Sequence, residues 1–189
     1  MTTEPIRDKK QLQALSDYFL YNRQIRNYVL FTVALHTALR ISDILRLRWD
    51  DVYDFVEKRP RIQAFITEKK TGKAKIITLN KRVASALAMY ASKAVQGAAL
   101  IANPKTGKAI SRVQAYRIFR DAAEIIGMES RVSCHSLRKT FGYLVRKAGV
   151  SPELIMEIYR HSSYNITRRY IGITQDEMDQ VYLTMEMLL

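Results

Sequence analysis

Charged and imidazole side chains stand three residues apart at two places in the chain. Asp43 follows Arg40 at this interval, and Arg138 follows His135. Side chains three apart share one face of a helix, so Asp43 could hold the Arg40 guanidinium in a fixed orientation, and His135 with Arg138 could bind one anion. A surface ion pair and a solvated helix terminus are the ordinary explanations of such pairs, and spacing alone does not separate these possibilities.

Other reactive groups lack the spacing that their chemistry needs. The three histidines show no metal-binding pattern. Cys134 directly precedes His135, and adjacent side chains diverge on a helix or a strand, so the two do not form a thiolate dyad. The segment from Lys105 to Lys108 is similar to a phosphate-binding loop, but alanine occupies both flanking positions, 102 and 109, that require Gly and Ser or Thr. No metal or cofactor is therefore expected.

A further histidine and a tyrosine complete an ordered set along the chain. His161 follows Arg138 by 23 residues, and Tyr170 follows His161 by 9. The set resembles the catalytic signature of the tyrosine recombinases, the phage integrase family. ALRISDILRLRWDDV resembles the arginine motif of that family, KKTG resembles its hairpin lysine, and CHSLRKTFGYLVRKAGVSPELIMEIYRHSSYNITRRY resembles its remaining motifs. The members of the set are Arg40, Lys70, His135, Arg138, His161 and Tyr170.

Two positions depart from the family pattern. Ala38 stands where the family usually has glycine, and Arg160 stands where glycine commonly precedes the second histidine. Glycine adopts backbone conformations that other residues avoid, so these departures concern the backbone and remove no reacting group.

The resemblance implies that Tyr170 is a nucleophile. Its phenol oxygen would attack the scissile phosphate, form a 3′-phosphotyrosyl bond and expel a 5′-hydroxyl, so that rejoining needs neither ATP nor a metal. A neutral phenol is a poor nucleophile and needs nearby cations or a base, and Arg168 and Arg169 lie just upstream. The chain has 11 tyrosines, and packing is the ordinary role of any one of them.

The resemblance also assigns roles to the other members of the set. Arg40 and Arg138 would bind the phosphate oxygens, because a guanidinium can do so bidentately. His161 would donate a further hydrogen bond to the same phosphate. Lys70 would protonate the 5′-oxygen, although Lys69, Lys73 and Lys75 share the same hairpin and leave the choice of lysine open. His135 would assist proton transfer at the tyrosine.

The net charge favours a polyanionic partner. The chain has 31 Lys and Arg against 18 Asp and Glu, a formal net charge of +13 over 189 residues. Each neutralised phosphate releases counterions, although a merely basic protein would have the same composition. With the resemblance, the expected partner is double-stranded DNA, and Asp43 would support the site by orienting neighbouring catalytic side chains. The side chains expected to bind DNA are Lys69, Lys73, Lys75, Arg168 and Arg169.

The composition and the ends of the chain favour a cytoplasmic location. Apolar runs fall short of the roughly 20 residues that a membrane-spanning helix needs. Met1 to Lys10 is a polar segment without the apolar stretch of a secretory signal, and the lone Cys134 leaves no intramolecular disulfide.

The elements that must position these residues are mainly helical. Apolar residues recur three and four apart from Leu12 to Leu47, which is typical of amphipathic helices, with Asp8 as a cap and a short third helix expected from Leu39 to Trp49. Further helices are expected at about 82–95, 112–126 and 136–148, with another opened by Ser151 and Pro152.

One segment changes to the period of a β-strand. Residues 61–67 and 74–79 alternate or cluster β-branched residues on either side of the basic segment 69–73, which predicts a β-hairpin with a basic tip. The expected fold is therefore a single α+β, mainly helical domain over residues 1–189, of the tyrosine-recombinase catalytic type. A last helix is expected over 174–189, because its apolar residues share one face.

The resemblance leaves several points open. An N-terminal core-binding domain is not expected, because only 39 residues precede Arg40. The chain is similar either to short single-domain members, such as the invertases that flip fimbrial promoter segments, or to a catalytic fragment of a longer integrase. The last helix could pack on its own domain or dock on a neighbouring subunit, with a monomer in solution assembling as a tetramer on DNA. A DNA-relaxing enzyme of the type IB topoisomerase kind and a non-cutting DNA-binding regulator are the alternatives to a recombinase.

Overall fold

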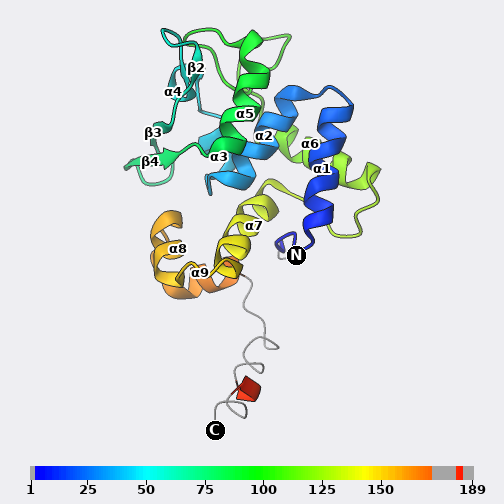
Figure 1. Cartoon of the computed structure of the whole chain (residues 1–189), viewed down its shortest axis with the longest axis vertical. Coiled ribbons are helices and arrows are strands. Elements are labelled where there is room, and N and C mark those ends of the chain that lie inside the picture. Colours follow the sequence, from blue (N-terminus) through cyan, green and yellow to red (C-terminus); the bar gives the residue numbers. More distant parts are fainter. Residues whose placement is uncertain (1–2, 172–181, 185–189) are drawn as a thin grey trace.

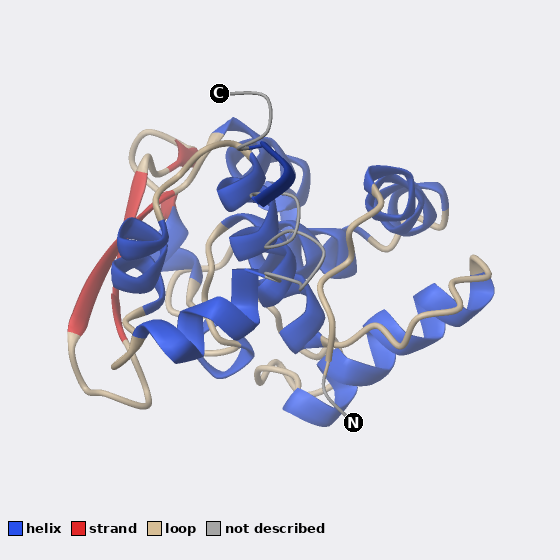
Figure 2. Cartoon of the chain, turned by 90° about the horizontal axis from the view of Figure 1, so that it is seen from below, coloured by secondary structure: helices blue, strands red, loops and turns tan. Residues whose placement is uncertain are grey.

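Helices make up most of the molecule, and the strands lie at one edge (Figures 1 and 2). The computed structural model describes residues 3–171 and 182–184. In these residues no helix is both long and apolar enough to cross a bilayer. The helices are α1 (Lys9–Tyr21), α2 (Ile25–His36), α3 (Ile41–Ile44), α4 (Trp49–Val52), α5 (Lys81–Tyr90), the 3-10 turn η1 (Ala91–Lys93), α6 (Arg112–Ile125), α7 (Cys134–Lys147), α8 (Pro152–Tyr159) and α9 (Tyr164–Ile171). The strands are β1 (Tyr53–Asp54), β2 (Arg59–Pro60), β3 (Gln63–Thr67) and β4 (Ala74–Thr78).

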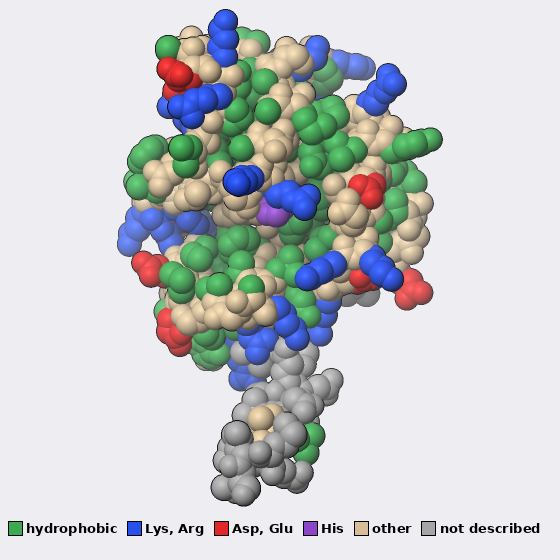
Figure 3. Space-filling view, viewed as in Figure 1, with side chains coloured by type: hydrophobic (Ala, Val, Ile, Leu, Met, Phe, Trp, Pro, Cys, Tyr) green, Lys and Arg blue, Asp and Glu red, His purple; other side chains and the backbone are tan. Residues whose placement is uncertain are grey.

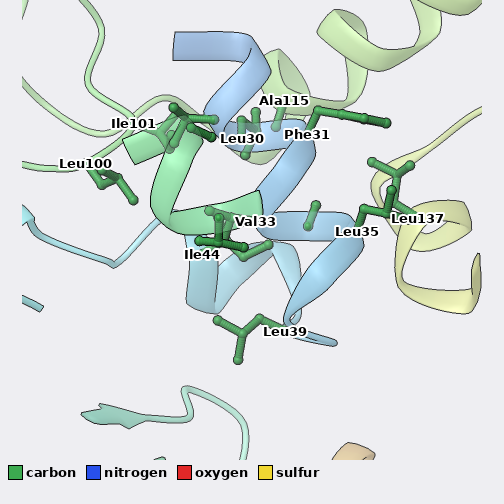
Figure 4. Packing of buried hydrophobic residues seen from close by; sticks show 14 of the residues in the cluster. Leu30, Phe31, Val33, Leu35, Leu39, Ile44, Leu100, Ile101, Ala115 and Leu137 are labelled. Atoms are coloured by element: carbon green, nitrogen blue, oxygen red, sulfur yellow. The ribbon is translucent and has the colours of Figure 1, made fainter. Parts of the chain in front are cut away.

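The main core is built around α2. Its residues from Val29 to Leu35 are all buried, so this helix is covered on every side, and it contacts α1, α3, α5 and α7. Figure 4 shows Leu30, Phe31 and Val33 of α2 among apolar side chains from other elements. The mainly helical α+β class predicted from the sequence is confirmed, and α2 is the element around which the other helices pack.

Polar caps fix where several helices begin. Asp8 accepts a hydrogen bond from the Lys10 backbone at the start of α1, as predicted. Ser133 and Ser136 form a capping box at the start of α7, and Ser151 caps α8 ahead of Pro152. Such caps satisfy backbone N–H groups that lack a partner within the helix. The cap at Ser133 starts α7 two residues earlier than the sequence pattern predicted.

Two predicted helices are shorter than expected. The helix predicted from Leu39 to Trp49 is divided into α3 and α4, because the chain turns after Ile44 and pairs with Ala99 through an isolated bridge at Arg48. The helix predicted to reach Val95 ends at Tyr90 and continues only as η1. The predicted last helix, 174–189, lies outside the described residues except for 182–184, which are helical.

The predicted hairpin is formed by β3 and β4. They pair antiparallel with Phe65 opposite Ile76 and Ala64 opposite Ile77. Ala64 and Ile77 are buried, whereas Phe65 and Ile76 are exposed, so one face of the hairpin packs on the core. The turn between the strands contains Gly72 in a left-handed conformation, with φ +67°. This arrangement places the basic tip of the hairpin outside the core.

A second, smaller cluster joins α8 and α9 to the end of α7. Its buried members are Ala38, Ile155, Tyr159 and Ile171. In Figure 1, α8 and α9 lie below the main body and are reached through α7. Because Leu137 of α7 belongs to the main core and the second half of α7 packs against the small cluster, this helix connects the two.

Candidate active site

Arg40 and Arg138 enter the site from different elements. Arg40 directly precedes α3, and its Nη1 lies 3.3 Å from Glu68 Oε1. Arg138 is buried on α7, where its Nη1 donates to the Ala38 carbonyl and its Nη2 donates to the Tyr159 carbonyl at 3.3 Å. Arg138 thereby joins the segment before Arg40 to the end of α8.

The Tyr170 ring lies among the predicted catalytic side chains. Its centroid is 5.0 Å from that of His135 and 4.6 Å from that of His161. The Arg138 guanidinium carbon lies 5.8 Å from the same centroid. The structure therefore brings together a phenol, two imidazoles and a guanidinium that come from α7, α9 and the turn between α8 and α9.

The surroundings of His161 favour its neutral form. Burial, followed by the charges of Arg138 and Arg40, lowers the pKa of His161 to about 4. Its Nδ1 lies 3.0 Å from Thr167 Oγ1, and its ring stacks on Tyr159 with centroids 4.9 Å apart. In the tautomer in which the Thr167 hydroxyl donates to Nδ1, Nε2 carries the proton and can donate to a ligand.

His135 keeps part of its ring open to solvent. Partial burial, then Lys139 and Arg138, lower its pKa below the ordinary value of histidine. A neutral imidazole can accept a proton, which is what a base beside Tyr170 requires.

The hairpin lysines differ from one another in position. Lys70 is exposed in the turn, and its positive charge contributes to the lowered pKa of His161. Lys69 and Lys73 are also exposed. Lys75, in contrast, is turned inward: its Nζ donates to the Ile158 carbonyl at 2.5 Å, and burial together with Arg138 lowers its pKa to about 8. Its side chain is thus engaged within the protein, unlike those of the exposed Lys69, Lys70 and Lys73.

Asp43 does not hold Arg40 as the spacing suggested. Within the described residues, the Arg40 guanidinium pairs with Glu68, and Asp43 Oδ1 accepts a hydrogen bond from the Lys69 backbone at 2.9 Å. The reason is that α3 begins only after Arg40, so the two side chains do not share a helical face. Asp43 instead fixes the start of the hairpin turn, next to Lys70.

A cavity of about 520 Å³ opens onto this cluster. Arg40, His135, Arg138 and Tyr170 line it together with side chains from the start of α6 and α7. Figure 3 shows Lys and Arg side chains beside a histidine in the middle of one face of the molecule. The lining residues that sequence reasoning did not single out are Ile41, Ser42, Arg112, Val113, Tyr116 and Ser133.

The match to known families agrees with this geometry. The model of the phage integrase family matches residues 7–177. The chain belongs to the phage integrase family. Among curated proteins, it is similar to the probable integrase/recombinase YoeC of Bacillus subtilis, with 37% identity over 95% of this chain and 94% of that protein.

Other integrase-family relatives are more distant. The fimbriae regulatory protein FimE of Escherichia coli is 29% identical over 85% of this chain and 82% of its own length. The tyrosine recombinase XerD of Mycobacterium leprae is 27% identical, and the chain covers 51% of that protein. The chain therefore spans most of some relatives and about half of others.

Solved structures of integrase-family proteins share the fold. The XerA recombinase superposes with a TM-score of 0.77 at 19% identity, over 96% of this chain and 64% of that one. The XerH recombinase in its post-cleavage complex gives a TM-score of 0.76 over 95% of this chain and 52% of that one.

Both departures from the integrase-family glycine pattern retain a glycine-like backbone. Ala38 has φ +55° and Arg160 has φ +52°, so each adopts the left-handed conformation that glycine adopts without strain. The interpretation of these positions as backbone positions is confirmed. The carbonyl of Ala38 in this conformation is the one that receives Arg138.

Several supporting residues of this integrase site had no recognisable sequence signal. Glu68 is a buried carboxylate in a hairpin that otherwise reads as basic, and Tyr159 looks like a core aromatic residue at the end of α8. Thr167, fully buried, bonds to His161. Burial raises the pKa of the Cys134 thiol to about 12, which agrees with the expectation that it is no nucleophile. Among the described residues, no cluster of three potential ligands could hold a metal ion.

Proposed function

We propose that the protein is a site-specific DNA recombinase that cleaves and rejoins strands through a 3′-phosphotyrosine at Tyr170. The observation that carries this proposal is the position of the Tyr170 ring, which lies within 6 Å of His135, His161 and Arg138 as measured above. Family membership, and relatives named integrase or recombinase, support the same activity.

Cleavage would begin with attack of the Tyr170 oxygen on the scissile phosphate. His135 takes the phenol proton, because its ring is adjacent and neutral. The new bond joins phosphorus to the tyrosine oxygen, and the bond from phosphorus to the 5′-oxygen breaks. The energy of the phosphodiester is retained in the phosphotyrosine, so a 5′-hydroxyl of another strand can reverse the step.

Two arginines and a histidine would stabilise the charge that develops on the phosphate. Arg40 and Arg138 line the cavity and supply guanidinium donors to the non-bridging oxygens. His161 would donate from Nε2, in the tautomer in which the Thr167 hydroxyl donates to Nδ1. Donors held in place before the reaction need no rearrangement when charge develops, which is the main electrostatic contribution to catalysis.

Lys70 would protonate the leaving 5′-oxygen. It lies at the exposed tip of the hairpin, and its positive charge contributes to lowering the pKa of His161. Lys75 is the competing candidate, because its pKa of about 8 suits proton transfer near neutral pH. Lys75 Nζ, however, donates to the Ile158 carbonyl and is held within the protein, whereas Lys70 is exposed at the hairpin tip, so Lys70 is preferred.

Double-stranded DNA would be the substrate and partner. The XerH and lambda integrase structures that share this fold are DNA complexes. Lys69, Lys73 and Arg168 are exposed. Together with Arg169, they would contact the phosphates that flank the cleavage position. The protein would be a monomer in solution and a tetramer on DNA, with the segment 174–189 docking on a neighbouring subunit.

Covalent trapping tests the proposal. Duplexes that the wild-type protein binds are selected from a randomised pool and rebuilt as suicide substrates, with a nick beside each possible cleavage position. The wild type should form a protein–DNA adduct that survives denaturation, and Tyr170→Phe should form none. Tyr164→Phe, a partly exposed tyrosine of the same helix, is the matched control and should form the adduct.

The same assay separates the alternatives. Binding without an adduct on any selected duplex would support a non-cutting regulator. An adduct with relaxation of a supercoiled plasmid, but no exchange between two cleavage sites, would support a DNA-relaxing enzyme. Adduct formation followed by strand exchange would support the recombinase.

A further inference from the structure

The turn before His161 carries an arginine in a strained conformation. Arg160 is left-handed at φ +52°, where an L side chain is disfavoured and glycine would be free of strain. Its guanidinium is partly buried and directed toward the β3–β4 hairpin: Nη1 lies 3.8 Å from Glu68 Oε2, and Nη2 donates to the Ala74 carbonyl. The long side chain at this position therefore makes contacts that glycine could not make.

The Glu68 carboxylate pairs with two arginines, one at each of its oxygens. Its side chain is 1% exposed, with Oε1 facing Arg40 and Oε2 facing Arg160. Thr71, in the hairpin turn, donates a hydrogen bond to Oε2 at 2.9 Å. A buried carboxylate needs such partners, because an isolated charge in the interior is strongly disfavoured.

A second contact, besides those of Arg160, joins the β3–β4 hairpin to the end of α8. Lys75 of β4 donates to the Ile158 carbonyl, two residues before Arg160. The hairpin, which carries Lys70 in its turn, is thus attached through both Lys75 and Arg160 to the end of α8, which directly precedes His161.

We infer that Arg160 and Glu68 form a bridge that positions the β3–β4 hairpin, and with it the general acid, over the phosphate. Arg160 and Glu68 are positioning residues: they touch the elements that carry Lys70 and His161, and the proton is transferred by the lysine. This inference rests on the proposed cleavage reaction.

A change of leaving group provides the test. In a suicide substrate with sulfur in place of the bridging 5′-oxygen, the leaving thiol ionises more readily than an alcohol, so it departs without a well-placed acid. Arg160→Gly should slow adduct formation about tenfold to a hundredfold on the oxygen substrate, yet remain within about threefold of wild type on the sulfur substrate. Arg160→Lys should recover part of the rate on the oxygen substrate.

Arg23→Gly is the matched control. Arg23 also has a left-handed backbone, with φ +54°, and lies exposed between α1 and α2, so its replacement removes an arginine and relieves the same strain. It should cleave both substrates at the wild-type rate. Glu68→Gln keeps the shape of the buried side chain and should show the same sulfur rescue as Arg160→Gly, with melting temperatures used to confirm that each variant is folded.

The possible outcomes test the inferred Arg160–Glu68 bridge separately from the proposed cleavage reaction. An Arg160→Gly protein as fast as wild type on the oxygen substrate would overturn the inference. Equal slowing on both substrates would also overturn it, because the bridge would then act on the nucleophile or on Arg40. A wild-type protein that forms no adduct on either substrate would refute the proposed function itself.

Discussion

The main core and the second cluster are held together by different forces. Around α2 the contacts are apolar, with Phe19, Phe31 and Phe119 packed ring against ring at 6.0–6.5 Å. The cluster of α8 and α9 has few buried apolar members. Its largest side chain, Tyr159, lies with its ring centroid 4.5 Å from the guanidinium carbon of Arg138 and stacks on the ring of His161. Tyr170, the proposed nucleophile, lies on this smaller part.

The two regions should therefore control different properties. The main core controls the stability of the fold, and the second cluster controls how the side chains of the site are aligned. Dispersion and the hydrophobic effect act over the whole main core and do not depend on direction, so they determine whether the chain folds. Hydrogen bonds and ring contacts around Tyr159 are few and directional, so they determine where His161 and Tyr170 lie. Substitutions in the two parts should therefore have different consequences.

The largest loss of stability is expected in the main core. Phe119→Ala removes a fully buried ring and should lower the free energy of unfolding by about 3–5 kcal/mol. Ile155→Ala, in the second cluster, should cost about 2 kcal/mol, the lower end for such changes, but should slow adduct formation about tenfold because α8 no longer holds the turn to His161. Urea unfolding and single-turnover cleavage measure both quantities. A slower reaction in the folded Phe119→Ala protein than in Ile155→Ala would contradict the separation.

Arg138 connects the two parts, and its geometry is expected to matter more than its charge. Arg138→Lys should slow cleavage by about 10²–10³-fold, because a lysine loses both the bidentate grip on phosphate and the paired contacts to Ala38 and Tyr159. DNA affinity should change little, since the charge is kept. Arg120→Lys, at an exposed ion pair with Asp121, is the control and should cleave normally. Equal rates for the two variants would show that charge alone suffices.

Gly142 tests how tightly Tyr159 is seated against α7. A Cβ at this position would lie 2.6 Å from the Tyr159 hydroxyl oxygen, which donates to the Arg138 carbonyl at 2.5 Å. Gly142→Ala should destabilise the protein by about 1–3 kcal/mol, although alanine in a helix is otherwise favoured by about 1 kcal/mol. Combining it with Tyr159→Leu, which removes the clashing atoms, should give a smaller loss than the sum of the two single changes. Strict additivity in thermal unfolding would mean that the two residues do not press on each other.

The smallest expected effect is on acid stability. The pKa of His161 is lowered to about 4, and those of His36 and His135 are also lowered, so an unfolded chain binds more protons than the folded one below about pH 6.5. Stability should be fully present above pH 6.5 and decline as the pH falls toward 4, with the effect of His161 partly screened by solvent. His161→Gln should reduce this decline in melting temperature. An unchanged decline in the variant would show that His161 has no part in it.

The family motifs and most helices could be predicted because their signals are local or ordered along the chain. Caps such as Ser133 and Ser151 act on backbone groups within one turn, and the period of apolar residues reveals which face is buried. The order and spacing of the motifs allowed Tyr170 to be singled out among 11 tyrosines. Errors arose at helix ends, where tertiary contacts at Arg48 and Tyr90 decide termination.

The sequence by itself determined a basic, mainly helical chain with a recombinase-type set of reacting residues. Only the tertiary structure decided that Arg40 pairs with Glu68 and not Asp43, and that Lys75 points inward. The physical reason is that these bonds join segments far apart in the chain, separated by 28 residues in one case and 83 in the other. A buried carboxylate pairs with the cation that tertiary packing places beside it, and the residues near the carboxylate in the sequence do not indicate which cation that is.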